Sequence, residues 1–479
     1  MGAKHLDRLS LADAAFLWEE DRGTHAHIGW VMIFEGPPPA YADLLKHVQA
    51  RLHLVPRYRQ KLAFPPLQLA LPLWIDDPRF NLEYHVRHAA LPAPGSWDQL
   101  RALVGRIFSQ GLDRSKPLWE LWLVQGLHDR RFAIINKAHR AVVDGIAGVD
   151  ISTVLFDTSP HPAPVPPAER RWVPRPEPSP AELVTAGIRN LVAGPIEAAR
   201  QAWSALGDPE ATAATAREVV QSVRELAAAY VRPPSPTPLN VPLGTHRRVY
   251  WTRCRLADFK RIKNTFGGTI NDVYLTVVTG ALAAWLRRRG IRTRRLQMRA
   301  DFRISLRNAS TGGSRIVKYL APLPVGASGP LERLHTVRRL LDELKRSRQT
   351  LGARAIAALQ DFTPPALLAR VSRLTFSSRL FNLIAAYVPG PQFPLYLLGH
   401  KVVQVGPVGF LVERCALMVT LVSYNRMLEF GLLADADALP DLDDLGGDIE
   451  AAIAELLDAA RKQKLGGHAR NSRRRGADA

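Results

Sequence analysis

A proline-rich segment divides this chain into two blocks, each of which alternates predicted helices and strands. The segment, 159–180, holds many prolines and few apolar runs, which is typical of a linker. An alanine-rich stretch of helical periodicity, 181–231, follows it, and fits either helices packed on the body or an amphipathic element lying on lipid. A chain of 479 residues is long enough for two or more domains. The pattern therefore predicts two α/β blocks around a central connection.

Hydrophobic periodicity predicts the elements of each block. Apolar residues three and four positions apart indicate helices, and short apolar runs indicate buried strands. The first block has predicted helices at 41–52, 97–109 and 145–156 and strands at 28–34 and 132–135; the second has a helix at 271–289, capped by Asn271 or Thr269, and strands at 317–325 and 416–423. The polar, basic tail predicts disorder from residue 464 onward.

The residues that point most directly to chemistry are His139, Arg140, Asp144 and Gly145, spaced as H-R-x-x-x-D-G. Alone, this string is a weak signal, because a surface histidine and a turn with Asp-Gly give the same letters. Arginine has only hydrogen-bond donors and stays protonated at any working pH, so it cannot accept a proton. Histidine can, because its pKa lies near neutrality.

Four further segments strengthen the signal, and they are 9–18, 112–120, 267–273 and 388–391. In order and spacing they resemble the bacterial wax ester synthase/diacylglycerol acyltransferase family over roughly residues 5–460. The motif resembles the HHxxxDG signature of the acyl-CoA-dependent acyltransferases, with Arg140 in place of the second histidine. The resemblance implies an α/β fold of two chloramphenicol-acetyltransferase-like sandwich lobes with a tunnel between them.

The expected domains follow from these landmarks. They are an N-terminal lobe with the motif at 1–157, a proline-rich linker and amphipathic helices at 158–245, a C-terminal lobe at 246–463 and a disordered basic tail at 464–479.

The resemblance also implies a reaction. An alcohol, either diacylglycerol or a long-chain fatty alcohol, attacks the thioester of acyl-CoA, which serves as a substrate, and no other cofactor or metal is expected. The reaction needs a general base for the hydroxyl and a group that stabilises the oxyanion. In the family the second histidine of the motif is that base, and here its position is Arg140.

Several roles stay open. His139 is either a hydrogen-bonded scaffold residue or a replacement base, and on extended backbone it points away from the side chain of Arg140. Arg140 is either a lost catalytic residue or a ligand for Asp144 or the phosphates of CoA. The resemblance implies that Asp144 is structural and paired with an arginine, for which Arg303 and Arg307 are the candidates. Gly145 permits tight packing at the start of the next helix.

Other polar positions depart from the family pattern. They include Ala386-Tyr387 before the Val-Pro-Gly-Pro segment, the stretch 301–307, and Gly313-Ser314. Asn271 and Asp272 match the family's Asn-Asp motif and are candidates for substrate binding or for helix capping. Three functions therefore remain: an O-acyltransferase, slow because its base is replaced; a non-catalytic paralogue that binds acyl-CoA or lipid; and acyl transfer to a different acceptor.

The chain is strongly basic, with a formal net charge of +20. It has no zinc-finger or RRM-type signature, so nucleic acid is not an expected partner. The charge is consistent with a solubilising surface or with attraction to the phosphates of acyl-CoA, an anionic membrane surface or a lipid droplet. Two cysteines, no apolar leader and no long uncharged apolar stretch predict a cytoplasmic, peripherally membrane-associated protein.

Overall fold

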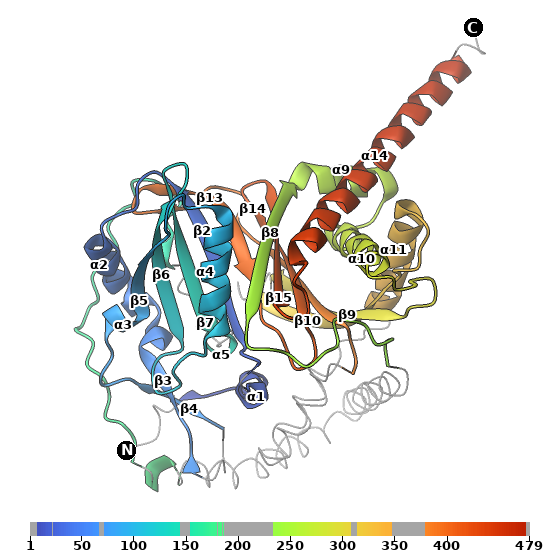
Figure 1. Ribbon diagram of the computed structural model, residues 1–479. Coiled ribbons are helices and arrows are strands. Elements are labelled where there is room, and N and C mark those ends of the chain that lie inside the picture. Colours follow the sequence, from blue (N-terminus) through green and yellow to red (C-terminus); the bar gives the residue numbers. More distant parts are fainter. Residues whose placement is uncertain are drawn as a thin grey trace, which may run out of the picture.

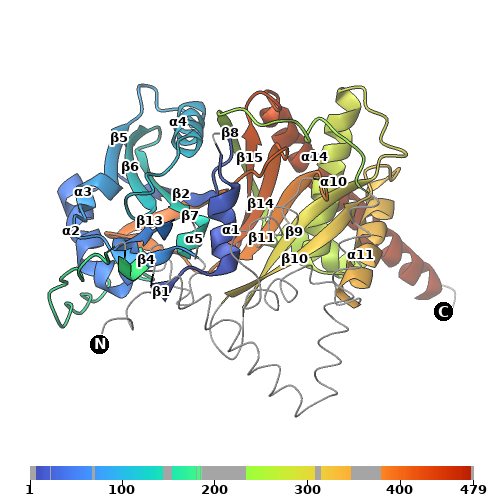
Figure 2. The same cartoon turned by 90° about the horizontal axis from the view of Figure 1, so that it is seen from below.

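Two lobes, each built on a six-stranded sheet, lie side by side (Figure 1). The computed structural model describes residues 7–21, 23–66, 71–143, 154–179, 181–183, 185, 233–307, 314–346 and 379–475. The predicted fold class, two α/β lobes, is confirmed. Figure 2 shows the lobes from below, with α1 at the junction between them.

The sheet of the N-terminal lobe is antiparallel except at one edge, where β5 and β6 run parallel. Its order is β12 (Tyr396–Leu397), β13 (His400–Val408), β2 (His27–Glu35), β7 (Arg131–His139), β6 (Trp119–Leu127) and β5 (Val86–Ala90). A small sheet of β1 (Asp7–Arg8), β4 (Leu73–Asp76) and β3 (Gln60–Ala63) lies below it. The helices of this lobe are α1 (Leu11–Glu19), α2 (Tyr41–Arg51), α3 (Leu82–His85), α4 (Trp97–Ser109) and α5 (Arg140–Val143), with short 3₁₀ turns at Leu52–Leu54 and Pro56–Arg59.

The sheet of the C-terminal lobe mixes parallel and antiparallel pairs. Its order is β10 (Ser314–Leu323), β9 (Met298–Arg307), β11 (Leu383–Pro389), β14 (Leu417–Tyr424), β15 (Met427–Asp435) and β8 (Arg247–Arg255). The helices α9 (Leu256–Phe266), α10 (Ile270–Arg288), α11 (Pro330–Arg346) and α14 (Leu442–Arg475) pack on one face of this sheet.

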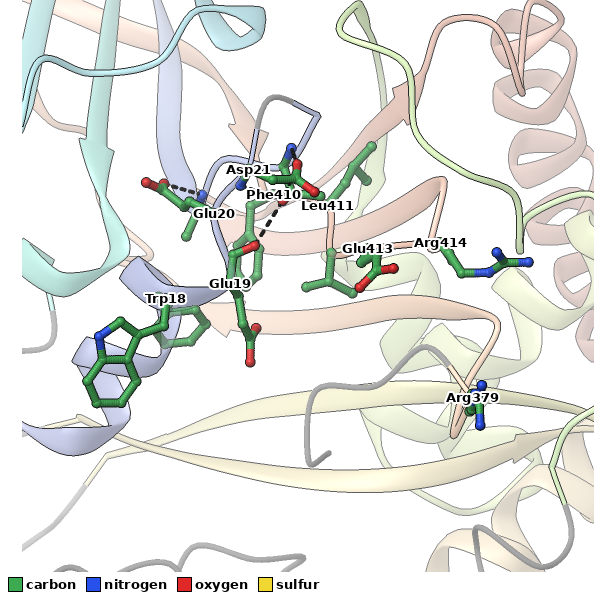
Figure 3. Close-up of a pocket in the computed structure, with 13 residues that line it drawn as sticks. Trp18, Glu19, Glu20, Asp21, Arg379, Phe410, Leu411, Glu413 and Arg414 are labelled. Atoms are coloured by element: carbon green, nitrogen blue, oxygen red, sulfur yellow. Dashed lines mark hydrogen bonds between the residues drawn. The ribbon is translucent and has the colours of Figure 1, made fainter. Parts of the chain in front are cut away.

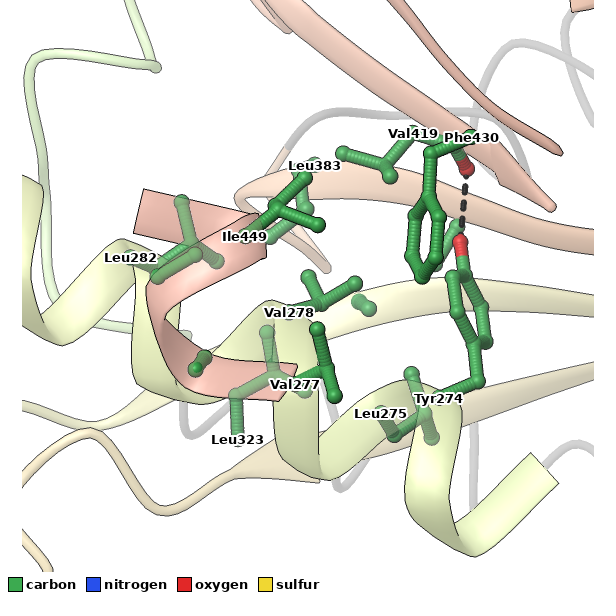
Figure 4. Close-up of a cluster of buried hydrophobic side chains, with 14 of the residues drawn as sticks. Tyr274, Leu275, Val277, Val278, Leu282, Leu323, Leu383, Val419, Phe430 and Ile449 are labelled. Atoms are coloured by element: carbon green, nitrogen blue, oxygen red, sulfur yellow. Dashed lines mark hydrogen bonds between the residues drawn. The ribbon is translucent and has the colours of Figure 1, made fainter. Parts of the chain in front are cut away.

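The core of the C-terminal lobe lies between α10 and the sheet (Figure 4). Helix α10 is apolar nearly all round, which is the pattern of a helix buried on every side. The hydroxyl of Tyr274 donates to the carbonyl of Val419 at 2.8 Å, so the phenol oxygen is satisfied within the core. The hydroxyls of Thr276 and Thr279 donate to carbonyls one turn earlier, which lets these two polar residues lie in an apolar environment.

One crossing strand joins the two lobes. Strand β13 comes from the C-terminal half of the chain but pairs with β2 in the N-terminal sheet. The carbonyl of Pro407 on β13 accepts a hydrogen bond from the indole of Trp251 at 3.2 Å. The same carbonyl oxygen lies so close to Gly431 that a Cβ there would be 2.0 Å from it. The expected C-terminal lobe, 246–463, therefore needs a correction, because β12 and β13 belong to the other sheet.

The predicted elements that depend on local periodicity match the structure closely. The helix at 97–109 has those same bounds, and the helices at 41–52 and 271–289 become α2 and α10 with ends shifted by one residue. The predicted helix at 145–156 lies largely outside the described residues, as does the stretch 181–231. The stretch predicted to be disordered from residue 464 instead continues α14 up to Arg475, although it contains Gly466 and Gly467.

Across the described ranges, no single helix has the length and apolarity needed to cross a membrane. The helices α9 and α10 together reach that length and apolarity, but they are bent by 100° relative to each other.

Candidate active site

The H-R-x-x-x-D-G motif begins where β7 ends. His139 is the last residue of β7 and pairs with His27 of β2, while Arg140 is the first residue of α5. The backbone N–H of His139 donates to the carbonyl of Leu118, and that of Arg140 donates to the carbonyl of Ala26 at 2.8 Å. The motif is thus fixed by the strands and loops on either side of it. Asp144 and Gly145 lie outside the described residues, and their expected roles remain predictions.

Both ring nitrogens of His139 face protein groups. The backbone N–H of Ala141 donates to Nδ1 at 3.1 Å, and Nε2 lies 3.1 Å from Oε1 of Glu20. Since Nδ1 accepts a hydrogen bond, the neutral ring carries its proton on Nε2, which is close to the carboxylate but lacks the geometry of a hydrogen bond to it. The side chain is 1% exposed. This arrangement leaves the ring no lone pair for a substrate hydroxyl, and it favours the scaffold role for His139.

Glu20 is the residue that holds this ring, and it was not among the residues predicted from the sequence. Its Oε1 accepts the N–H of Ala26 at 2.8 Å, and its Oε2 accepts a guanidinium N–H of Arg114 at 2.6 Å. Burial alone would raise the pKa of Glu20, but His139, Arg114 and the Ala26 amide together lower it to about 2. Glu20 follows directly on α1, two residues past the recognised segment 9–18. Its closeness to that segment in the sequence could have marked it as a candidate site residue.

Arg140 is buried and cationic. Burial and the nearby charge of Arg303 lower its pKa to about 10, and the attraction of Asp13 opposes this effect. The guanidinium carbon lies 5.7 Å from the ring centre of Phe16. Even with this lowered pKa the group is protonated at neutral pH, so Arg140 can stabilise negative charge but cannot remove a proton.

Arg303 belongs to a buried charge cluster on β9 and β10. Its Nε and Nη2 donate to Oδ2 of Asp301 at 3.1 and 2.7 Å, and Nζ of Lys318 lies 3.4 Å from the same oxygen. Burial would raise the pKa of Asp301, but the charges of Arg303 and Lys318 lower it. Arg303 is therefore committed at least in part to Asp301. The pairing of Asp144 with Arg303 or Arg307 stays a prediction, because neither Asp144 nor the side chain of Arg307 is described.

Asn271 and Asp272 lie in the first turn of α10. The carboxylate of Asp272 accepts the N–H of Thr269 at 2.6 Å, and Thr269 Oγ1 accepts the N–H of Asp272 at 3.4 Å, which together form a capping box. The cap accounts for Oδ2 of Asp272, while its buried Oδ1 has no hydrogen-bond partner among the described residues. Oδ1 of Asn271 is buried and has no hydrogen-bond partner within the described ranges, so its binding role stays open. Neither residue lines the cavity at the lobe junction.

That cavity has a volume of about 790 Å³ and draws its walls from both halves of the chain (Figure 3). On one side lie α1 and the loop after it, and on the other the segment after β13. The rings of Phe16 and Phe410 meet edge to face with centres 5.6 Å apart, and Arg140 lies against Phe16. Glu20 lines the cavity and also faces His139, so the cavity borders the motif. The lining residues are Phe16, Trp18, Glu19, Glu20, Asp21, Thr24, Ala26, Arg379, Phe410, Leu411, Val412, Glu413 and Arg414.

A group of possible metal ligands lies beside the motif. Glu20, His25 and His27 place one ligand atom each within 4.8 Å of one another, and Nε2 of His27 lies 3.8 Å from Oε1 of Glu20. Burial and the charge of Lys137 lower the pKa of His27 well below its usual value. A metal ion bound here would be repelled by the positive charge of Lys137. The Glu20 carboxylate also already accepts hydrogen bonds from Ala26 and Arg114. The group therefore fits the network around His139 better than it fits a metal.

Comparisons with known proteins point to one family. The wax ester synthase/diacylglycerol acyltransferase catalytic domain matches residues 9–274, and the C-terminal domain of the same family matches residues 312–457. A probable diacylglycerol O-acyltransferase of Mycobacterium tuberculosis is 32% identical over 98% of this chain and 99% of its own length. A putative diacylglycerol O-acyltransferase of the same organism is 30% identical over 98% of this chain and 93% of its own length.

Solved structures show the same architecture. The wax ester synthase/diacylglycerol acyltransferase of Marinobacter aquaeolei VT8 aligns over 95% of this chain and 99% of that one, with a TM-score of 0.68 and 25% identity. The starter condensation domain of rhizomide synthetase aligns over 95% and 94% with a TM-score of 0.58, and its 14% identity shows a common fold alone. The resemblance found in the sequence is confirmed: this chain belongs to the wax ester synthase/diacylglycerol acyltransferase family.

Proposed function

We propose that this protein is an O-acyltransferase that moves a fatty acyl group from acyl-CoA to diacylglycerol or a long-chain alcohol, with acyl-CoA as a substrate and no other cofactor. Family membership along nearly the whole chain supports the reaction class. The observation that carries the proposal is the cavity of about 790 Å³ at the lobe junction, which borders the motif through Glu20 and Phe16.

The groups around the motif supply part of the chemistry. As the alcohol attacks the thioester, its proton must leave and negative charge develops on the carbonyl oxygen. The protonated guanidinium of Arg140 can stabilise that oxygen, since it keeps its charge near neutral pH. The ring of His139 offers no free lone pair, and Glu20, with a pKa of about 2, is a weak base. We therefore expect a slow transferase that lacks an efficient general base.

The substitution Arg140→His tests this mechanism. Restoring an imidazole at that position should raise turnover by roughly 10²–10⁴-fold, the usual contribution of general acid–base catalysis. Turnover is measured as release of free CoA from palmitoyl-CoA with dipalmitoylglycerol or hexadecanol as the acceptor. A matched control is Arg414→His, which adds an imidazole to the wall of the same cavity away from the motif. If the wild type is already fast and His139→Ala abolishes its activity, His139 is the base and our mechanism is wrong.

A second candidate function is binding without turnover. The commitment of His139 to Glu20 and Ala141, together with the cationic Arg140, favours it. If neither the wild type nor Arg140→His turns over any of these substrates while calorimetry shows binding of palmitoyl-CoA, the protein is an acyl-CoA or lipid-binding paralogue. If palmitoyl-CoA does not bind at all, both functions are excluded for this acyl donor.

We also propose peripheral attachment to anionic membranes or lipid droplets, and not to nucleic acid. The net charge of +20 supports it, because juxtamembrane cations are attracted to acidic lipids and salt screens that attraction. Flotation with vesicles containing phosphatidylglycerol should decrease as ionic strength rises. Equal flotation with neutral vesicles would contradict an electrostatic attachment.

A further inference from the structure

The loop between α1 and β2 touches the motif at both of its ends, and we call it the cradle loop; the structure describes it at residues 20–21 and 23–26. At its start, Oε1 of Glu20 lies 3.1 Å from Nε2 of His139. At its end, the carbonyl of Ala26 accepts the backbone N–H of Arg140 at 2.8 Å. The two ends are joined, since Oε1 of Glu20 also accepts the N–H of Ala26 at 2.8 Å. The position of the cradle loop therefore sets the surroundings of both motif residues.

Hydrogen bonds inside the cradle loop make it a compact unit. Oδ1 of Asp21 accepts the N–H groups of Gly23 and Thr24 at 2.7 and 2.8 Å. The N–H of Asp21 donates to the carbonyl of Thr24 at 3.2 Å. The hydroxyl of Thr24 donates at 3.0 Å to the carbonyl of Glu19, the last residue of α1. A displacement of the tip at Gly23 is therefore passed on to both ends of the cradle loop.

An arginine of the C-terminal lobe holds the tip of the cradle loop. Arg247, the first residue of β8, donates through Nη2 to the carbonyl of Gly23. Its Nη1 donates to the carbonyl of Gly244 at 2.9 Å and to Oδ2 of Asp435, the last residue of β15, at 3.2 Å. The side chains of Arg247 and Asp435 are 5% and 1% exposed. A buried ion pair of one lobe thus carries the contact that fixes the cradle loop of the other.

The chemistry of this contact favours an arginine. A guanidinium presents five N–H donors in one rigid plane, so it can meet a carboxylate and several carbonyls at once, whereas a lysine ammonium is a compact charge on a flexible stem. Burial lowers the pKa of Arg247, and the charges of Asp435 and Asp21 oppose this effect. Since Asp21 belongs to the cradle loop, charge attraction and hydrogen bonding pull the loop in the same direction.

We propose that Arg247 is a positioning residue, which locks the cradle loop against the C-terminal lobe and thereby orients His139 and Arg140. The inference rests on the proposed function for the reaction that this orientation serves. The backbone of Arg140 is held by Ala26, so a displaced loop moves the guanidinium away from the carbonyl oxygen on which negative charge develops. Arg247 is not among the described residues that line the cavity, and it acts through the loop.

Two substitutions loosen this contact in different ways. Arg247→Lys keeps the charge beside Asp435 but loses the planar fork that reaches Gly23. Gly23→Ala leaves the buried ion pair intact. Its added Cβ would lie 3.0 Å from the carbonyl oxygen of Leu243, so the tip of the cradle loop must shift.

Matched controls make the same two changes away from the cradle loop. Arg248→Lys replaces the neighbouring arginine, whose pair with Asp443 is exposed. Gly329→Ala adds a carbon that has no atom within 4 Å. Circular dichroism and thermal unfolding verify that all four variants fold. If Arg247→Lys does not fold, Gly23→Ala alone decides.

The first readout is turnover, measured as release of CoA from palmitoyl-CoA with hexadecanol as the acceptor. Both loop variants should lower kcat by roughly 10- to 100-fold, the effect of a misplacement of about 1 Å, and leave KM nearly unchanged. The second readout is the ring-nitrogen spectrum of protein labelled with ¹⁵N-histidine, in which His139→Gln identifies the signals of His139. These signals should shift in both loop variants and stay in place in both controls, because a change in overall stability alone does not alter the hydrogen bonds of one ring.

The outcomes separate this inference from the proposed function. A lower kcat together with shifted His139 signals, in both loop variants and in neither control, supports the inference. With an active wild type, it is overturned if kcat or the His139 signals of the loop variants match the wild type, if only KM rises, or if only one of two folded loop variants has an effect; the acyltransferase function then still stands. If the wild type releases no CoA but the signals shift in both loop variants, the proposed function fails while the positioning role of Arg247 stands. If the wild type releases no CoA and the signals do not shift, both fail.

Discussion

Glu429 gives the most quantitative prediction about this protein. It lies on β15, is 1% exposed, and neither carboxylate oxygen has a hydrogen-bond partner within the described residues. Burial raises its pKa from an ordinary 4.5 to about 8, against a small opposing effect of Arg253 on β8. The side chain is therefore a neutral acid at pH 7, and it becomes a buried anion as the pH rises through about 8.

The sign of the effect on stability follows from proton binding. Between pH 4.5 and about 8 the folded protein keeps a proton that the unfolded chain has released, so stability falls as the pH rises through this window. Each pKa unit corresponds to about 1.36 kcal/mol, so the loss across the whole window, from 4.5 to about 8, is on the order of 5 kcal/mol. Below pH 4.5 the stabilisation is complete, and well above pH 8 none of it remains.

Glu429→Gln removes the charge and keeps the shape. The free energy of unfolding of this variant, relative to the wild type, should increase by on the order of 5 kcal/mol from pH 4.5 to pH 9. Guanidinium unfolding followed by tryptophan fluorescence at each pH gives the difference. Glu343→Gln is the matched control, because Glu343 is an exposed glutamate on the surface of α11 and the substitution makes the same chemical change. A difference for Glu429→Gln that does not change with pH would refute the reasoning, and would mean that the carboxylate is ionised or solvated throughout.

Two further predictions concern the motif and the lobe junction. Glu20→Gln should destabilise the protein by about 2 kcal/mol at pH 7, because a charged acceptor beside His139 is lost. Since the pKa of Glu20 is lowered to about 2, the difference in free energy of unfolding between wild type and variant should shrink as the pH falls below 4.5. A difference that stays the same at every pH would contradict this. Gly431→Ala would place a Cβ 2.0 Å from the carbonyl oxygen of Pro407, so we expect a large drop in the unfolding temperature, whereas Gly447→Ala, with no atom within 4 Å of the added carbon, should leave it nearly unchanged.

The site could be predicted from the sequence only where its residues are adjacent in the chain. The motif 139–145 and the segment 267–273 were recognised by their letters, and they led to the correct family. Glu20 was missed because its role depends on the contact with His139, more than a hundred residues away. The capping role of Asp272 was one of two alternatives, and the hydrogen bonds with Thr269 support it, while Oδ1 of Asp272 has no hydrogen-bond partner among the described residues.

Local sequence by itself determined several helices and strands of this protein, among them α2, α4, α10 and β2. The periodicity of 97–109 and the cap at Thr269 depend on neighbours within one or two turns, and these elements fold as their sequences indicate. Only the tertiary structure decided which half of the chain supplies β13, which backbone group occupies Nδ1 of His139, and that the carboxylate of Glu429 is buried without a hydrogen-bond partner among the described residues. The physical reason is that strand pairing, desolvation and charge interactions join residues far apart in the chain, and no local pattern encodes their distances.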